Sequence, residues 1–415
     1  MSSLRTVARF ATLCAVIFSL GSLPIDSIAQ DKNAKAPPPP QLGKLVRKSL
    51  VAAQKAASEQ KWAECISNGE AANAVPEKTA YDLFVINDIL GFCKIRSNDQ
   101  TGALAAFEFV ANSEFADAAR KALLNKAVLQ LAYNAKQYPK AIDYGTRLIG
   151  AGGAEENTYL LVAQSHYLQN DFKSTRAFAE TWIRQLEAEG KVPADLAIQL
   201  FLSSCIRLDD NACSLSALEL QAAHHPKEQT WPSLILILFR DTPEANTLDV
   251  FRLARETGAL RRGEEYTEMS QLAIEKGLPG EAQSVLEQGE AANVFTTPAL
   301  KELSKRLLAS AKTQATADRP VLAKQEKESA TNKNGQVDVR IGQAFTSYGQ
   351  YAQAITAIER GLAKGNVRNV PEARLSLGIA QLRAGNKTAA AEAFKSVDGD
   401  EFMKRLARLW GLQAR

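Results

Sequence analysis

An internal repeat constrains this chain more than any other feature of its sequence. Near the C-terminus, residues 341–362 (IGQAFTSYGQYAQAITAIERGL) align with residues 377–397 (LGIAQLRAGNKTAAAEAFKSV). Both segments carry a glycine early in a first helix, a glycine at a turn and an alanine in a second helix; these are Gly342, Gly349 and Ala354, then Gly378, Gly385 and Ala390. A glycine within a helix lets a neighbouring helix approach closely, and a glycine at a turn accepts a positive φ. The pattern predicts stacked helical hairpins.

Similar turns recur upstream in the chain. The positions just after each turn lie 38, 38 and 34 residues apart, at Trp62, Gln100, Tyr138 and Phe172. Another unit places Pro279 at this position, two repeats before Tyr351. Such a near-constant spacing is typical of one repeated structural unit rather than of separate globular domains.

The turn, glycine and alanine positions resemble the tetratricopeptide repeat (TPR), from about residue 45 to about residue 400. The resemblance implies an all-α fold, a TPR-like helical-hairpin solenoid wound as a right-handed superhelix. Several positions depart from the TPR signature: Trp62 has no glycine before it, Gln100 and Pro279 replace aromatic residues, and Thr175 stands at an alanine position. We expect altered packing geometry in those units.

The N-terminus has the three parts of a secretory signal. Arg5 and Arg9 precede an apolar stretch at residues 10–23, and small residues then flank Ile28. We expect cleavage after Ala29 and a periplasmic location for the mature chain. A membrane anchor is the alternative, but the apolar stretch is shorter than the roughly 20 residues that span a bilayer.

The sequence divides into five parts, which are a signal peptide (1–29), a proline-rich linker (30–42), a TPR-like helical array (43–312), a polar, degenerate segment (313–336) and a C-terminal TPR pair with a terminal helix (337–415). We expect the polar segment to form a long solvated helix followed by a loop at residues 332–335. After residue 29, no segment approaches the length of a membrane span, since the most apolar one, residues 234–239, is short.

Charge and composition argue against several functions. The chain has 50 Lys and Arg against 46 Asp and Glu, a net charge of +4 over 415 residues. This balance provides no polycationic surface, so we do not expect nucleic-acid binding. Only three histidines are present, which leaves few general bases or metal ligands.

Four cysteines remain beyond the signal peptide. An even number in an exported chain permits two disulfides, and we favour the local pairings, Cys205 with Cys213 and Cys65 with Cys93. The alternative is that all four are small buried hydrophobic residues, as free cysteines commonly are.

Three segments contain residue types found in metal, catalytic or phosphate-binding sites, but the residues around them argue against each of these roles. His224 and His225 are adjacent and precede a proline, so their side chains are not expected to converge on one metal. His166 is expected to pack on a first helix. Residues 150–156 (GAGGAEE) lack the GK[ST] ending of a phosphate-binding loop and instead indicate a helix stop and a helix start.

A superhelix of hairpins forms a concave groove lined by the first helices of successive repeats. We expect this groove to hold a protein or peptide partner. The candidate groove residues are first-helix positions that the repeat register leaves unburied: Asn87, Lys94, Gln130, Asn134, Gln164 and Tyr167.

The layout also resembles a group of bacterial exported TPR proteins that accompany the TonB, ExbB and ExbD energy-coupling systems. The motifs that carry this resemblance are residues 79–92 (TAYDLFVINDILGF), 141–149 (AIDYGTRLI), 277–289 (GLPGEAQSVLEQG), 347–355 (SYGQYAQAI) and the ending RLARLWGLQAR. The resemblance implies a periplasmic scaffold or adaptor with these partners, but it brings no defined binding residues.

Two other functions stay open. One is a cell-envelope or polysaccharide-export assembly factor that uses a similar groove. The other, weaker, is a helical glycan-processing enzyme, which needs paired carboxylates in a cleft. The densest acidic cluster, Glu264, Glu265 and Glu268, fits better as first-turn charges that match a helix dipole. We therefore predict no catalytic residue, no cofactor and no metal site, and hence no enzyme activity.

Overall fold

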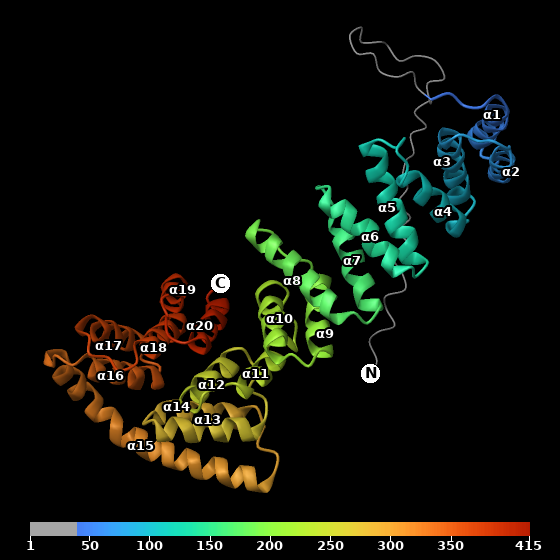
Figure 1. The fold of residues 1–415 in the computed structure, drawn as a ribbon. Coiled ribbons are helices and arrows are strands. Elements are labelled where there is room, and N and C mark those ends of the chain that lie inside the picture. Colours follow the sequence, from blue (N-terminus) through green and yellow to red (C-terminus); the bar gives the residue numbers. More distant parts are fainter. Residues whose placement is uncertain (1–39) are drawn as a thin grey trace, which may run out of the picture. The chain divides into compact units, whose positions relative to one another are not determined.

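The computed structural model describes residues 40–415. Within this range the chain forms twenty α-helices, one short 3-10 helix and no β-strand (Figure 1). This confirms the expected all-α solenoid of helical hairpins. The predicted signal peptide and nearly all of the predicted linker lie outside the described residues.

The described chain divides into two compact units between Leu90 and Gly91. The first unit contains α1 (Lys44–Ser58), α2 (Trp62–Asn73) and most of α3 (Ala80–Arg96). The second unit begins within α3 and continues with α4 (Gln100–Ala111), α5 (Ala118–Asn134), α6 (Tyr138–Gly150), α7 (Glu156–Leu168), α8 (Phe172–Ala188), α9 (Asp195–Arg207), α10 (Asn211–His224), α11 (Thr230–Arg240), η1 (Glu244–Asn246), α12 (Thr247–Glu256), α13 (Gly263–Glu275), α14 (Pro279–Ala291), α15 (Pro298–Thr331), α16 (Gly335–Ser347), α17 (Tyr351–Lys364), α18 (Val370–Arg383), α19 (Lys387–Lys395) and α20 (Glu401–Gln413).

Hairpins along the chain turn through one residue in the left-handed conformation. The turns that the sequence marks with glycine use Gly277, Gly349 and Gly385, and the equivalent residues elsewhere are Gln60, Asn98, Lys136, Asn170 and Asp209. After the turn, a backbone amide donates to a carbonyl five residues back in the first helix, as from Gln350 to Phe345 (2.9 Å). This bond satisfies a carbonyl that the helix end leaves open. The turn geometry therefore persists where glycine is replaced.

Close contact between the helices of the two C-terminal hairpins depends on glycine. A Cβ atom at Gly342 on α16 would lie 2.4 Å from the Ile358 side chain on α17. A Cβ atom at Gly378 on α18 would lie equally close to the Phe394 ring on α19, at 2.4 Å. Both distances are far below van der Waals contact. The predicted role of these two glycines is confirmed.

The polar segment belongs largely to α15, a helix of 34 residues that contains Pro320. Its predicted start, residue 313, falls inside this helix, and a short loop follows at residues 332–334. Although α15 is long, no helix among residues 40–415 combines the length and the hydropathy that a membrane span requires. The long solvated helix and its following loop are thus present.

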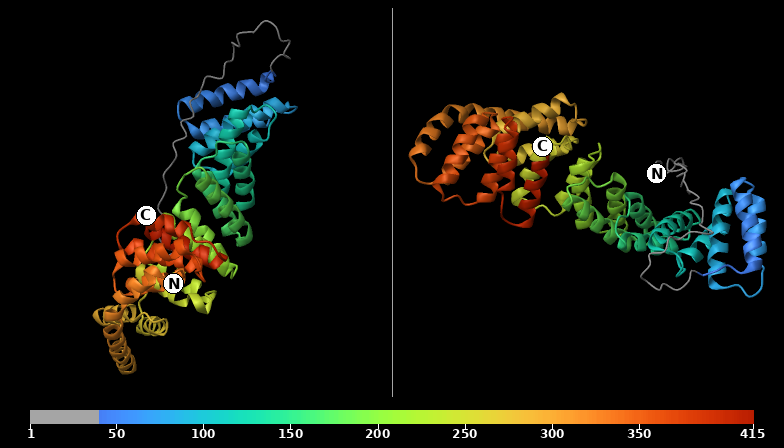
Figure 2. Two further views of the ribbon diagram at one scale, coloured as in Figure 1. Left: turned by 90° about the vertical axis from the view of Figure 1, so that its left-hand side faces the viewer. Right: turned by 90° about the horizontal axis from the view of Figure 1, so that it is seen from above.

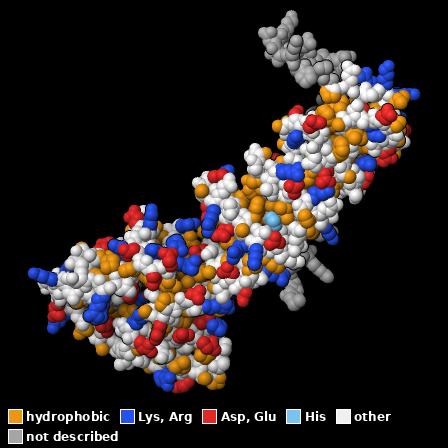
Figure 3. Space-filling model, viewed as in Figure 1, with side chains coloured by type: hydrophobic (Ala, Val, Ile, Leu, Met, Phe, Trp, Pro, Cys, Tyr) orange, Lys and Arg blue, Asp and Glu red, His pale blue; other side chains and the backbone are white. Residues whose placement is uncertain are grey.

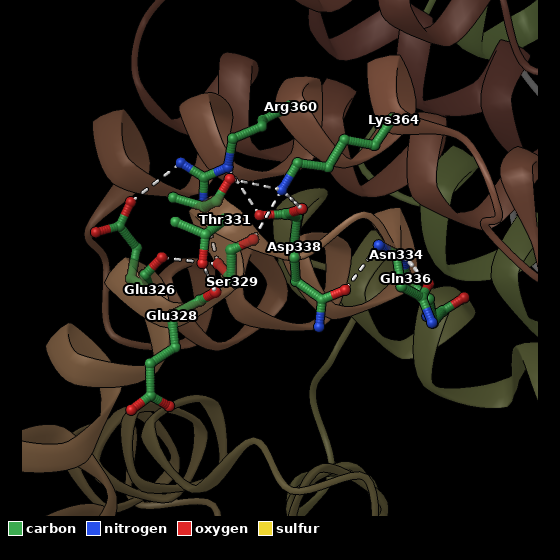
Figure 4. Close-up of polar contacts among 11 residues, drawn as sticks. Glu326, Glu328, Ser329, Thr331, Asn334, Gln336, Asp338, Arg360 and Lys364 are labelled. Atoms are coloured by element: carbon green, nitrogen blue, oxygen red, sulfur yellow. Dashed lines mark hydrogen bonds and ion pairs between the residues drawn. The ribbon is translucent and has the colours of Figure 1, made fainter.

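An ion cluster around the buried Asp338 anchors the C-terminal end of α15 to the next hairpin (Figure 4). Asp338 on α16 is fully buried and accepts hydrogen bonds from Arg360 and Lys364 on α17, each at 2.7 Å. Arg360 also reaches Glu326 (3.2 Å) and the Ser329 hydroxyl (3.1 Å) on α15. Every charged group in the cluster has an oppositely charged partner, which is what burial of charge requires.

The C-terminal helices return to an earlier part of the second unit. Figures 1 and 2 show α20 beside α10, and one continuous apolar core runs from Leu215 to Trp410. Polar contacts reinforce the closure: Arg415 donates to the Ala223 carbonyl (3.3 Å) and Asn246 donates to the Met403 sulfur (3.2 Å). The repeat pattern predicted an extended array, whereas the structure closes the array from α10 to α20.

Candidate functional site

Four of the six predicted groove residues lie on neighbouring first helices of the second unit. Gln130 and Asn134 are exposed on α5, where the Gln130 amide donates to the side-chain oxygen of Asn134 (3.1 Å). Gln164 and Tyr167 are half-buried on α7. The structure therefore brings these four polar side chains onto adjacent helices.

Hydrogen bonds join the first helices of successive hairpins. The Tyr133 hydroxyl on α5 donates to the Gln164 side-chain oxygen on α7 (2.9 Å), and the hydroxyls of Tyr167 and Ser203, on α7 and α9, lie 2.7 Å apart. Burial raises the pKa of Tyr133, so its hydroxyl stays protonated and able to donate. We call this surface the first-helix face; its residues are Gln130, Tyr133, Asn134, Gln164, Tyr167 and Ser203.

The other two predicted groove residues, Asn87 and Lys94, are half-buried on α3 and lie outside the first-helix face. The Asn87 amide donates to the Leu83 carbonyl of its own helix (2.8 Å). The Lys94 aliphatic chain packs over Gly102 on α4, where an added Cβ would lie 2.8 Å from it. These contacts direct both side chains to neighbouring protein atoms.

All four cysteines among residues 40–415 lie on helices, three of them fully buried and Cys213 half-buried. The structure joins Cys205 on α9 to Cys213 on α10 in a disulfide with Cα atoms 5.4 Å apart, within the usual range. Cys65 on α2 and Cys93 on α3 are fully buried. Their pairing with each other stays a prediction.

The histidines each contact a nearby protein group. His166 lies 3.8 Å from Asp171 and packs against the Phe178 ring, and burial lowers its pKa despite the nearby carboxylate. The ring of His224 hydrogen-bonds Glu187 (2.8 Å), and that of His225 hydrogen-bonds the Pro193 carbonyl (2.7 Å). Among residues 40–415, no group of three His, Cys, Asp or Glu side chains is arranged to hold a metal ion.

The acidic cluster at residues 264–268 begins α13. The Glu265 carboxylate accepts from the backbone amides of Arg261 and Arg262, both at 2.9 Å, and from the Arg262 side chain (2.8 Å). Burial raises its pKa, but these hydrogen bonds outweigh that effect and hold the pKa below the usual value. Glu265 thus satisfies the open amides at a helix start. Residues 150–156 likewise contain the end of α6 and the start of α7.

A polar cavity of 680 Å³ lies within the closed part of the second unit. Its walls come from α12, α14, α15, α16, α17 and α18. Arg255 on α12 donates to the side-chain oxygens of Gln288 (2.7 Å) and Ser284 (2.8 Å) on α14. Burial and the guanidinium of Arg383 on α18 lower the pKa of Arg255. We call this space the arginine cavity.

One wall of the arginine cavity is held rigid by Tyr348. Its ring packs against Gly280, where a Cβ would lie 2.4 Å away, and the Arg319 guanidinium lies 4.9 Å above the ring centroid. The Tyr348 hydroxyl donates to Asp318 (2.6 Å). Sequence reasoning missed this cavity because the residues that form it are far apart in the chain, and only the closure of the array brings α18 to α12.

The exposed charges of the described residues form no basic footprint in the view of Figure 3. Lys and Arg side chains are interspersed there with Asp and Glu side chains. That the protein binds no nucleic acid stays a prediction.

No family model and no curated protein matches the chain. Among solved structures, it is similar to a chain of Naa15/Naa10 bound to HypK-THB, with 13% identity and a TM-score of 0.30, over 86% of this chain and 59% of that one. It is also similar to the P58(IPK) TPR domain (13% identity, TM-score 0.20, 88% and 98% covered) and to yeast Tom70 (11%, 0.19, 89% and 95%).

Proposed function

We propose that this protein is a protein–protein interaction scaffold whose first-helix face binds a segment of a partner. The observation that carries the proposal is the pair of links between successive first helices, Tyr133 to Gln164 and Tyr167 to Ser203. These links fix polar side chains at regular intervals across α5, α7 and α9. A partner segment that crosses these helices meets an ordered row of donors and acceptors.

The exposed end of this row supports the same proposal. Gln130 and Asn134 are exposed, and among residues 40–415 their side chains hydrogen-bond only to each other, with the Gln130 amide donating to the Asn134 oxygen. This bond leaves the Gln130 oxygen and the Asn134 amide group available to a partner backbone. Such paired donors and acceptors suit an extended peptide better than an apolar helix.

The proposal also specifies where the protein is located and which proteins it binds. The N-terminal signal pattern supports export to the periplasm. The motif resemblance supports a role beside TonB, ExbB and ExbD, with this chain as scaffold or adaptor. In this role the protein has no catalytic step of its own.

Site-specific photo-crosslinking in living cells tests the proposal. A photoreactive residue at Asn134 should crosslink to a partner protein, whereas one at Thr146, exposed on the second helix α6, should not. Mass spectrometry of the Asn134 adduct should identify TonB, ExbB or ExbD. Equal crosslinking from both positions, or none from Asn134, contradicts the binding face. An adduct with an outer-membrane assembly or polysaccharide-export protein contradicts the energy-coupling role alone.

A further inference from the structure

We propose that the arginine cavity binds a small hydroxylated organic anion, such as a sugar acid or a sugar phosphate. The cavity is separate from the first-helix face, and the inference does not depend on the scaffold function. It rests on the charges of the lining residues, on an unsatisfied hydroxyl and on the size and polarity of the space.

The carboxylates that line the cavity are already neutralised. Glu281 accepts three hydrogen bonds from Arg252, the shortest at 2.6 Å. Glu256 pairs with Arg383 (3.3 Å), and Glu287 pairs with Lys312 (3.3 Å). Each of these carboxylates therefore has a cationic partner that balances its negative charge.

Arg255 has a different environment. Both of its side-chain hydrogen bonds go to neutral acceptors, on Gln288 and Ser284. Its guanidinium has five N–H donors, and residues 40–415 occupy two of them, so three remain for a ligand. The lowered pKa of Arg255 reflects burial and the positive charge of Arg383, and it indicates a site where a negative charge is favourable. An oxyanion at Arg255 fits this arrangement, because guanidinium groups bind carboxylate and phosphate in bidentate fashion. Arg383 can contribute only the N–H groups that remain beyond its Nε, which pairs with Glu256.

An unsatisfied hydroxyl provides independent support. Ser347 lines the cavity, and its hydroxyl oxygen is buried without a hydrogen-bond partner among residues 40–415. Buried polar atoms are nearly always hydrogen-bonded, so an orphan atom beside a cavity suggests a missing ligand group. Rotation of the Ser347 side chain toward the cavity would let this hydroxyl bond a hydroxyl or carbonyl group of the bound molecule.

The walls define the class of ligand. Apart from the charged groups, most lining residues are neutral and polar, with Leu382 as the aliphatic exception among them; the polar ones are Gln283, Ser284, Gln288, Thr346, Ser347, Tyr348 and Tyr351. A volume of 680 Å³ is in the range of small-molecule sites. Hydroxyl-rich molecules exploit such walls, whereas an apolar peptide side chain gains little from them.

Isothermal titration of the purified mature protein tests the inference, with glucuronate and glucose 6-phosphate as probes and glucose as the neutral comparison. We expect saturable binding of at least one anion and much weaker binding of glucose. Preference between the two anions distinguishes a carboxylate ligand from a phosphate ligand. The inference is overturned if neither anion binds saturably, or if glucose binds as tightly.

Variants locate the binding. Arg255→Gln and Ser347→Ala should each weaken anion binding, the first by about tenfold or more because a charged hydrogen-bond donor is lost. Arg340→Gln, at an exposed position on α16 away from the cavity, makes the same charge change and should bind normally. Circular dichroism confirms that each variant is folded. Unchanged affinity in both folded cavity variants places the ligand elsewhere and rejects the site.

Discussion

The Glu219 carboxylate on α10 lies 2.6 Å from the Nε atom of Arg405 on α20. This ion pair spans the closure of the array, beside the bond from Arg415 to Ala223, which joins residues 192 positions apart. Burial raises the pKa of Glu219, and Arg405 and Arg408 offset only part of that effect. The main effect of the pair is therefore to give the buried Glu219 carboxylate an oppositely charged partner.

Arg405→Ala should lower the free energy of unfolding by about 1–3 kcal/mol, because it leaves Glu219 buried without its nearest cation. The loss should shrink as the pH falls, since a raised pKa means that the carboxyl takes up its proton readily and then needs no partner. Urea denaturation at several pH values measures both effects. Arg408→Ala is the control: Arg408 is exposed and 3.9 Å from Glu219, so about 0.5 kcal/mol or less is expected. Equal losses of stability in the two variants would contradict the assignment of Arg405 as the main partner of Glu219.

Asp338→Asn should destabilise the junction of α15 with α16 and α17 by about 3 kcal/mol at neutral pH, because Arg360 and Lys364 lose their shared buried carboxylate. Burial raises the pKa of Asp338, but the hydrogen bonds from Lys364 and Arg360 outweigh it and place the pKa below its usual 3.8.

The pH dependence of this effect has a definite sign. A depressed pKa gives a contribution that is full above the unfolded pKa and is lost as the pH falls through the folded pKa. Thermal unfolding should therefore show the largest gap between wild type and Asp338→Asn near neutral pH and a smaller one in strong acid. Asp398→Asn, at an exposed ion pair, should change stability little at any pH. A gap that widens in acid would contradict a depressed pKa for Asp338.

Gly378→Ala should cost about 1–3 kcal/mol, because the new methyl group overlaps the Phe394 ring. Gly411→Ala provides a matched comparison: Gly411 is also helical, but nothing lies within 4 Å of its Cβ position. That change should stabilise the protein by about 0.5–1 kcal/mol through helix propensity. Guanidinium denaturation measures the change in the free energy of unfolding for both variants, and we expect the two changes to have opposite signs.

Cys205→Ser should lower stability by about 2–3 kcal/mol, as expected for a disulfide that closes a short loop, with a sequence separation of 8 in this chain. Non-reducing peptide mapping of protein purified with its free thiols blocked should show Cys205 linked to Cys213. Four free thiols in that protein would show instead that the cysteines are simply core residues. Dithiothreitol should destabilise the wild-type protein by reducing this disulfide. It should have no such effect on Cys205→Ser, because the variant lacks the bond.

The sequence by itself determined the repeat and its local geometry. Turn residues such as Gly349 and Gly385, and small residues such as Gly342 and Gly378, are local requirements of one hairpin, because a positive φ or a close helix contact admits few side chains. These signals lie within one repeat length, so their spacing could be measured along the chain. The same register assigns Gln130, Asn134, Gln164 and Tyr167 to first helices, and they lie on α5 and α7, but their role in a groove stays a prediction.

Only the tertiary structure decided where the array closes and what the closure creates. Glu219 meets Arg405, and Arg255 comes near Arg383, because small rotations accumulate over many stacked hairpins until α20 reaches α10. No single repeat encodes this accumulated rotation. The repeat register also does not reveal the side-chain contacts of Asn87 and Lys94, which bond or pack against nearby protein atoms. The arginine cavity therefore exists as a consequence of packing between distant helices.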